Sequence, residues 1–235
     1  MGLIYDNLST QKLRGGYYTP QAITHFLCQW SIQQDTNSVL EPSCGDGNFI
    51  ESAILRFKEL GINGDQLEGK ITGVELIKEE ALKAAERAKK LGLNTNTIIN
   101  SDFFHYVKSN QSIKYDVIIG NPPFIRYQNF PEEHRKLAIE MMQNLGLKPN
   151  KLINIWVPFL IVSASLLNDN GKLAMVIPAE LFQVKYVAET RVFLSEFFER
   201  ITIITFKKLV FKNIQQEVVL LLCEKKVDHG KGIRV

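Results

Sequence analysis

The chain has 235 residues and a net charge of +3, and with 45% hydrophobic and 23% charged residues it is neither a disordered polymer nor a collagen-like repeat. No apolar run reaches the roughly 18 residues of a membrane span, and the polar N-terminus argues against a secretory signal. The three cysteines lack any C-x-x-C spacing, which argues against a disulfide framework or a zinc knuckle and predicts a cytoplasmic protein.

Strands and helices are predicted to alternate along the chain. Apolar residues at helical spacing predict a helix from Pro20 to Trp30. Short apolar runs then predict seven strands, at residues 38–41, 71–75, 97–99, 115–119, 172–177, 201–206 and 217–223. Between them, helices are expected at 49–58, 79–90, 152–167 and 187–198, with a turn at 168–171 and a loop containing one short helix at 125–150.

This alternation is typical of a mainly parallel sheet with helices on both faces. The last two predicted strands have no helix between them, which permits a hairpin. The predicted fold class is therefore α/β, with a mainly parallel seven-stranded sheet and an antiparallel last strand.

The first strand runs through Glu41 into a loop that contains Gly45 and Gly47. Ligands of parallel sheets bind outside the carboxyl ends of the strands, and glycine lets the backbone approach a ligand closely. The loop is not G-x-G-x-x-G and no Lys-Ser/Thr follows it, so a phosphate cradle is not indicated. A tight strand-to-helix turn without a ligand is the alternative interpretation.

Two further acidic residues follow predicted strands. Glu75 ends the second strand, where a carboxylate can accept hydrogen bonds from two ribose hydroxyls. Asp102 and Phe103 follow the third strand, and an acceptor beside an aromatic ring suits an adenine. One such acid is often a helix cap or a solvated residue, but polar groups at three successive strand ends favour a nucleoside site.

Asn121, Pro122, Pro123 and Phe124 directly follow the fourth strand and its Gly120. The two prolines remove two N–H donors and leave carbonyl acceptors, while Asn121 adds an amide oxygen and Phe124 an aromatic face. This set suits a planar –NH₂ group conjugated to a ring. The four residues are the predicted catalytic tetrad, and a rigid Asn-Pro turn is the alternative.

The order of a Thr-Pro pair at Thr19, the glycine loop, Glu75, Asp102-Phe103 and the tetrad resembles the gamma-class N6-adenine DNA methyltransferases of restriction–modification systems. The resemblance implies a Rossmann-like, S-adenosylmethionine-dependent methyltransferase fold. It implies a catalytic domain over residues 38–235, with residues 1–37 forming a helical segment that completes the cofactor site. The expected reaction transfers a methyl group from S-adenosylmethionine to N6 of an adenine flipped out of double-stranded DNA.

By matching position, the resemblance assigns cofactor binding to Thr19, Glu41, Ser43, Gly45, Gly47, Glu75, Asp102, Phe103, Asn121 and Pro122. Asn121 and Pro122 are also expected to hold the target amino group, with Phe124 and Phe211 stacking on the flipped base and Phe206 as the alternative to Phe211. No metal is expected, because the four histidines His25, His105, His134 and His229 lack metal-ligand spacing and are interpreted as structural or exposed.

Family members usually continue into a C-terminal target-recognition domain, which is not found before Val235. A separate recognition domain or specificity subunit is therefore an expected partner. From Lys207 onward, seven basic residues against three acidic ones are expected to attract DNA phosphates.

Other functions stay open at this point. A protein glutamine N5-methyltransferase would use similar chemistry, but such enzymes usually carry an N-terminal helical domain, and only 37 residues precede Ser38. An RNA base methyltransferase is a second alternative. A non-catalytic nucleotide-binding or DNA-binding subunit is a third, against which the intact tetrad argues.

Overall fold

A computed structural model describes residues 18–93, 95–149, 154–184, 187–207, 217–226 and 232–234. The strands are β1 (Val39–Glu41), β2 (Ile71–Glu75), β3 (Ile98–Asn100), β4 (Tyr115–Gly120), β5 (Leu167–Pro178), β6 (Arg200–Thr205), β7 (Val218–Glu224) and β8 (Gly232–Arg234). The helices are α2 (Gln21–Ser31), α3 (Asn48–Glu59), α4 (Lys78–Lys90), α5 (Phe103–Ser109), α6 (Glu132–Asn144), α7 (Trp156–Ser165), α8 (Glu180–Gln183) and α9 (Ala188–Phe197).

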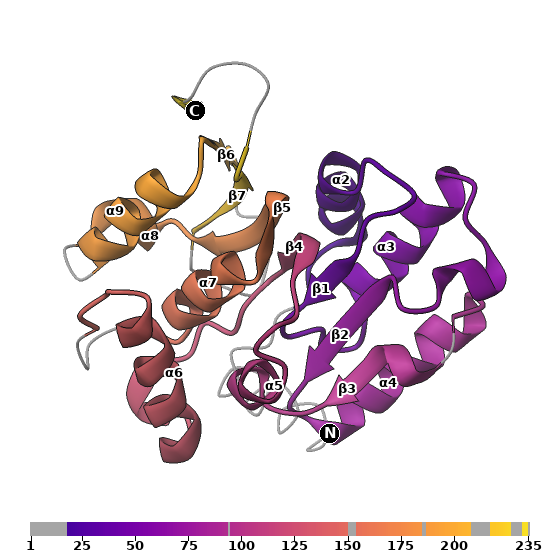
Figure 1. Ribbon diagram of the computed structural model, residues 1–235, viewed down its shortest axis with the longest axis horizontal. Coiled ribbons are helices and arrows are strands. Elements are labelled where there is room, and N and C mark those ends of the chain that lie inside the picture. Colours follow the sequence, from indigo (N-terminus) through magenta and orange to yellow (C-terminus); the bar gives the residue numbers. More distant parts are fainter. Residues whose placement is uncertain are drawn as a thin grey trace.

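The strands form one sheet in the order β3-β2-β1-β4-β5-β7-β6-β8 (Figure 1). The first five strands are parallel, and β7 pairs antiparallel with β5 and β6, which confirms the predicted fold class. The short strand β8 adds an eighth strand beside β6 that the sequence did not predict. Chain order reverses between β1 and β4, which is where ligands of such sheets bind.

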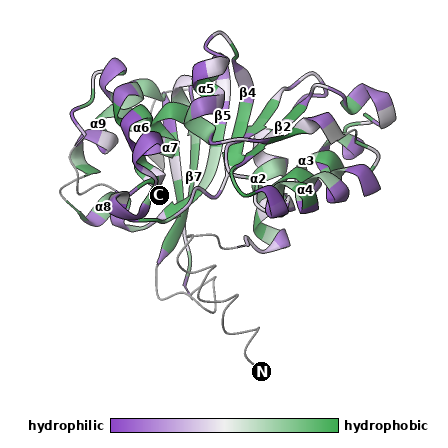
Figure 2. Cartoon of the chain, turned by 90° about the horizontal axis from the view of Figure 1, so that it is seen from below, coloured by the Kyte–Doolittle hydropathy of each residue, from purple (hydrophilic) through white to green (hydrophobic). Residues whose placement is uncertain are grey.

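Helices cover both faces of the sheet, and Figure 2 shows the hydrophobic strands between them. Helices α2, α3 and α4 pack on one face, where Ile50, Ala53, Ile54 and Phe57 of α3 are buried as their helical spacing predicts. Helices α5, α6, α7 and α9 pack on the other face. In the described residues no helix is long and apolar enough to cross a membrane.

Two predictions about local structure are wrong. The expected turn at 168–171 is instead part of β5, because Leu167 pairs with Tyr115 and Lys172 with Val117, so the intervening residues bulge opposite Asp116. The side chain of Asn168 donates to Asp116 across this bulge at 2.7 Å. The region 125–150 contains a helix of 13 residues, α6, rather than one short helix.

Gly47 is the N-terminal cap of α3, and its φ of +92° lies in the left-handed region. A Cβ added there would lie 3.0 Å from the Cα of Ala84 on α4. Glycine at this position therefore lets the turn after β1 pass directly against α4.

We expect Gly47→Ala to lower the free energy of unfolding more than Gly61→Ala. Gly61 has the same backbone conformation, with φ of +91°, but open space around it, so its substitution shows only the conformational cost of about 1–2 kcal/mol. In the Gly47 variant the added methyl group also clashes with α4, which should lower the free energy of unfolding by about 1–3 kcal/mol more. Urea unfolding measures both variants, and equal losses would contradict the close contact.

Candidate active site

A cavity lies at the carboxyl ends of β1, β2 and β4, where ligands of parallel sheets bind. The loops after these strands and after β3 form its walls. Thr19, which precedes α2, and Phe159 of α7 complete the lining. Nine residues of the predicted site line it, namely Thr19, Glu41, Ser43, Gly45, Glu75, Asp102, Phe103, Asn121 and Pro123.

Three predicted residues, Gly47, Pro122 and Phe124, do not line the cavity, and a fourth lies outside the described residues. Gly47 forms the turn into α3, and Pro122 is the buried member of the tetrad. Phe124 is half-buried and packs against the hydrophobic clusters of both faces of the sheet. Phe211 lies outside the described residues, and its proposed alternative Phe206 is half-buried in the cluster beneath α2 and α3.

The carboxylate of Glu75 connects two of the loops around the cavity. Its Oε2 accepts a hydrogen bond from the Gly45 N–H at 2.9 Å, and its Oε1 accepts one from the Ile77 N–H at 2.8 Å. Burial raises the pKa of Glu75 despite these two bonds. Each oxygen retains a lone pair for a ligand donor.

Glu41 is 2% exposed, and its Oε2 has no hydrogen-bond partner among the described residues. Burial raises the pKa of its carboxyl well above the ordinary value, and the nearby acids Glu75 and Asp46 raise it further. A buried polar atom without a partner is costly. This part of the cavity therefore fits a ligand that brings positive charge or hydrogen-bond donors.

Asn121 is held by two neighbouring segments. Its Nδ2 donates to the hydroxyl of Thr19 at 3.2 Å, and the Ser43 hydroxyl donates to its backbone carbonyl at 3.4 Å. Thr19 in turn accepts, through its carbonyl, a hydrogen bond from the Asn48 side chain at 3.2 Å. The start of the tetrad is thus fixed against the segment before α2 and the glycine loop.

Arg87 of α4 holds the glycine loop from the outside. Its guanidinium contacts Asp46 at 2.7 Å, Glu51 at 2.8 Å and the Asn48 side-chain oxygen at 2.5 Å. These contacts cross-link α4, the loop and the first turn of α3. The sequence interpretation missed Arg87, because no local pattern connects residues about 40 positions apart.

The end of the cavity after β3 is aromatic. Phe103 is buried and stacks on Phe159 of α7, with ring centroids 5.0 Å apart and planes at 26°. Phe130 and Ile125 complete this wall. Phe130, Phe159 and Ile125 come from segments that carry no motif, so the sequence predicted only Phe103 here.

Asp102 is 5% exposed and forms the N-terminal cap of α5, where its Oδ1 accepts a hydrogen bond from the His105 N–H at 3.0 Å. The His105 imidazole Nδ1 lies 3.1 Å from the same oxygen. His134 of α6 approaches the second oxygen. Asp102 therefore lines the cavity as predicted, but two histidines that the sequence left without a role lie beside it.

Residues 46–211 match the model of a family described as Eco57I restriction-modification methylase, which covers most of the chain. The chain belongs to this family. It is 26% identical to the type II methyltransferase M.AccI of Acinetobacter calcoaceticus over 220 residues, which are 92% of the chain and 38% of M.AccI. The predicted resemblance to restriction–modification DNA methyltransferases is confirmed at this level.

Two solved structures have the same fold. One is a class I S-adenosylmethionine-dependent methyltransferase assigned by similarity from Listeria monocytogenes, with a TM-score of 0.67, 18% identity and coverage of 93% of this chain and 64% of that one. The other is DrdV in complex with DNA, with a TM-score of 0.74 and 17% identity. The match covers 93% of this chain and 27% of the DrdV chain. The Rossmann-like methyltransferase fold is therefore confirmed.

We expect Glu41→Gln to stabilise the protein without ligand at neutral pH. In the folded protein the pKa of Glu41 is raised, so its contribution to stability is full below the unfolded pKa of about 4.5 and is lost as the pH rises toward the folded pKa. Glutamine does not titrate, so the variant should be no more stable than the parent protein near pH 4.5. Near neutrality its free energy of unfolding should be about 1–3 kcal/mol higher, which is the cost of an unpaired buried group.

Urea unfolding at these two pH values measures the effect, with Glu59→Gln as the control on the exposed end of α3. A Glu41→Gln variant that is less stable than the parent protein at neutral pH would contradict the conclusion that the buried carboxylate of Glu41 destabilises the folded protein.

Proposed function

We propose that the chain is the catalytic part of a DNA N6-adenine methyltransferase of a restriction–modification system. One observation carries the proposal: the tetrad that begins at Asn121 borders the same cavity as the strand-end acids Glu41, Glu75 and Asp102. A nucleoside site and an acceptor for an amino group are thereby combined. Family membership and the likeness to M.AccI support a role in restriction–modification.

The residues around the cavity fit S-adenosylmethionine. The unpaired oxygen of Glu41 faces a region that suits the cationic methionine end, beside Ser43, Gly45 and the turn at Gly47. Glu75 is assigned to the ribose hydroxyls, and Asp102 with Phe103 to the adenine. When bound, S-adenosylmethionine supplies an activated methyl group, because its sulfur leaves as a neutral thioether.

The tetrad is assigned to the target amino group. The side-chain oxygen of Asn121 and the carbonyl of Pro122 accept the two N6 hydrogens, which pulls the nitrogen toward tetrahedral geometry and concentrates its lone pair. Pro123 keeps the backbone rigid. Phe124 and Phe211 are proposed to stack on the base, which is worth roughly 1–3 kcal/mol per base.

A base within a duplex cannot enter this cavity, so the target adenine is proposed to flip out at a cost of a few kcal/mol. The DNA in the DrdV structure supports DNA as the substrate class. Because this chain spans about 38% of the length of M.AccI, we include a target-recognition domain or specificity subunit as a partner in the proposal.

The N-terminal segment is proposed to belong to the same catalytic unit. Thr19 lines the cavity and bonds to Asn121, and α2 packs against α3. Of the proposed helical segment at 1–37, which completes the cofactor site of a catalytic domain at 38–235, residues 1–17 lie outside the described residues, so the support rests on residues 18–37.

Transfer of a tritiated methyl group to DNA, RNA and protein tests the function. We expect label on DNA, recovered after digestion as N6-methyladenine. Label on glutamine side chains or on RNA would support the two alternative methyltransferases, and cofactor binding without transfer would support a non-catalytic subunit.

Asn121→Ala should slow the methyl-transfer step far more than it weakens cofactor binding. The lost acceptor acts mainly in the transition state, so single-turnover rates are expected to fall by about 10²-fold or more, as when one oxyanion-hole donor is removed. Asn144→Ala, at an exposed position at the end of α6, is the control. A near-normal rate in the Asn121 variant would rule out this use of the amide.

A further inference from the structure

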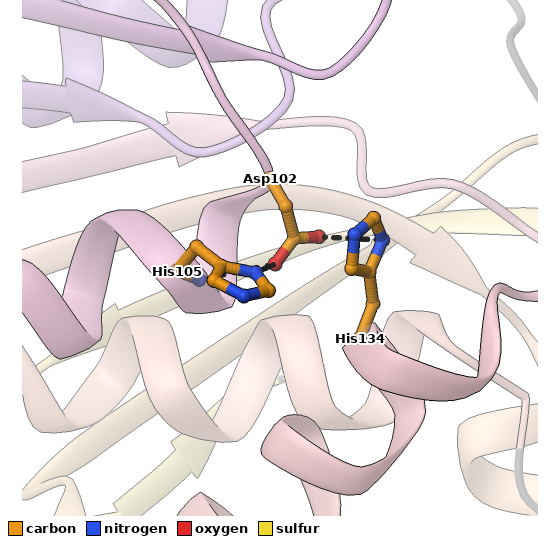
Figure 3. A group of neighbouring side chains, drawn as sticks. All are labelled: Asp102, His105 and His134. Atoms are coloured by element: carbon orange, nitrogen blue, oxygen red, sulfur yellow. Dashed lines mark hydrogen bonds and ion pairs between the residues drawn. The ribbon is translucent and has the colours of Figure 1, made fainter.

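Asp102, His105 and His134 form a compact cluster at the edge of the proposed cofactor cavity. His105 lies one turn after Asp102 on α5, and His134 comes from α6 (Figure 3). Both imidazoles are directed at the carboxylate: His105 Nδ1 lies 3.1 Å from Oδ1, and His134 Nδ1 lies 3.3 Å from Oδ2. One potential ligand atom from each residue lies within 4.8 Å of the others.

Within this cluster, the Nδ1 atom of His134 has an unusual environment. Its Nδ1 is buried and, although close to Asp102, forms no hydrogen bond among the described residues. A buried ring nitrogen directed at a carboxylate without a hydrogen bond is an unsatisfied polar group, which is costly. A metal ion bound between the His134 imidazole and the Asp102 carboxylate would give the buried nitrogen a partner.

The distances in the cluster suit a small transition-metal ion. With zinc–ligand bonds of about 2.0–2.1 Å, neighbouring ligands of a tetrahedral site lie roughly 3.3 Å apart. The two imidazole nitrogens lie at similar distances from the carboxylate, 3.1 Å from Oδ1 and 3.3 Å from Oδ2, and one ligand atom from each residue lies within 4.8 Å of the others. Two imidazoles and one carboxylate are typical ligands of Zn²⁺ or Co²⁺, whereas Mg²⁺ and Ca²⁺ prefer oxygen.

The surroundings of His105 also fit a metal ligand. Its other ring nitrogen, Nε2, lies 3.3 Å from Glu133 Oε1, the arrangement in which a carboxylate orients a metal-bound imidazole. A second, polar cavity opens beside it between α5 and α6, lined by His105, Lys108, Glu132, Glu133, Lys136, Leu137 and Glu140. Solvent in this cavity therefore reaches the His105 side chain, which is 39% exposed.

We propose that Asp102, His105 and His134 bind a divalent transition-metal ion of the Zn²⁺ class, and that this ion competes with the cofactor. The competition rests on the proposed function, in which Asp102 accepts a hydrogen bond from the cofactor adenine. When its carboxylate binds the metal, Asp102 no longer accepts this hydrogen bond. By thermodynamic linkage, the metal and the cofactor weaken each other's binding by the same factor.

Co²⁺ is the probe for the metal site, because its visible absorption reports coordination directly. Titration of the purified chain is expected to show one equivalent of Co²⁺ bound, with absorption from nitrogen and oxygen ligands and no thiolate charge-transfer band. His105→Ala and His134→Ala should each weaken binding by at least the 10–100-fold typical of altered outer-shell partners. His25→Ala, whose imidazole lies 3.9 Å from Glu59 on the opposite layer, should bind like the parent chain.

His134→Gln keeps the size of the side chain and provides a second variant if the alanine variant does not fold. Co²⁺ binding that is absent, or equally strong in both histidine variants, would overturn the metal site. Calorimetry of S-adenosylmethionine binding with and without Zn²⁺ tests the competition, and we expect weaker binding with Zn²⁺ in the parent chain but not in His134→Gln. Unchanged affinity would overturn the competition, whereas Co²⁺ binding without any cofactor binding would instead contradict the proposed function.

Discussion

The carboxylate of Glu75 fixes the backbone on which the whole cavity depends. It accepts one hydrogen bond from the turn after β1, at Gly45, and one from the turn after its own strand, at Ile77. A third bond, from Cys44 N–H to the Val74 carbonyl at 2.9 Å, holds the same loop to β2. Because β1 and β2 are neighbours in the parallel sheet, these bonds hold together the two loops that border the cavity.

This arrangement is costly before a ligand binds. Glu41 and Glu75 are both buried, and burial raises the pKa of each. The carboxylate of Glu75 raises the pKa of Glu41 further, and that of Glu80 raises the pKa of Glu75. The loop is stabilised from outside by Arg87, which reaches Asn48, and Asn48 bonds to Thr19, which accepts from Asn121. A continuous set of hydrogen bonds thus connects α4 to Asn121 at the start of the proposed catalytic tetrad.

The sequence predicted the parts of the molecule that local patterns determine. Apolar runs such as 71–75 matched β2 residue for residue, and strand-end motifs predicted nine lining residues of the cavity. It failed where contacts are distant. The bulge at 168–171 depends on pairing with β4. Phe130 and Phe159 line the cavity but come from segments that carry no motif. His134 meets Asp102 only because α6 packs on α5. No spacing rule could place His105 and His134 around one carboxylate.

A crystal structure with S-adenosylmethionine bound tests the central claim most directly, namely that the strand-end carboxylates form a cofactor site. We expect the methionine end near Glu41, the ribose hydroxyls on Glu75 and the adenine between Asp102 and Phe103, with the methyl group directed toward Asn121. A cofactor bound outside this cavity, or bound in it with its methyl group away from the tetrad, would show that the strand-end carboxylates do not form this site.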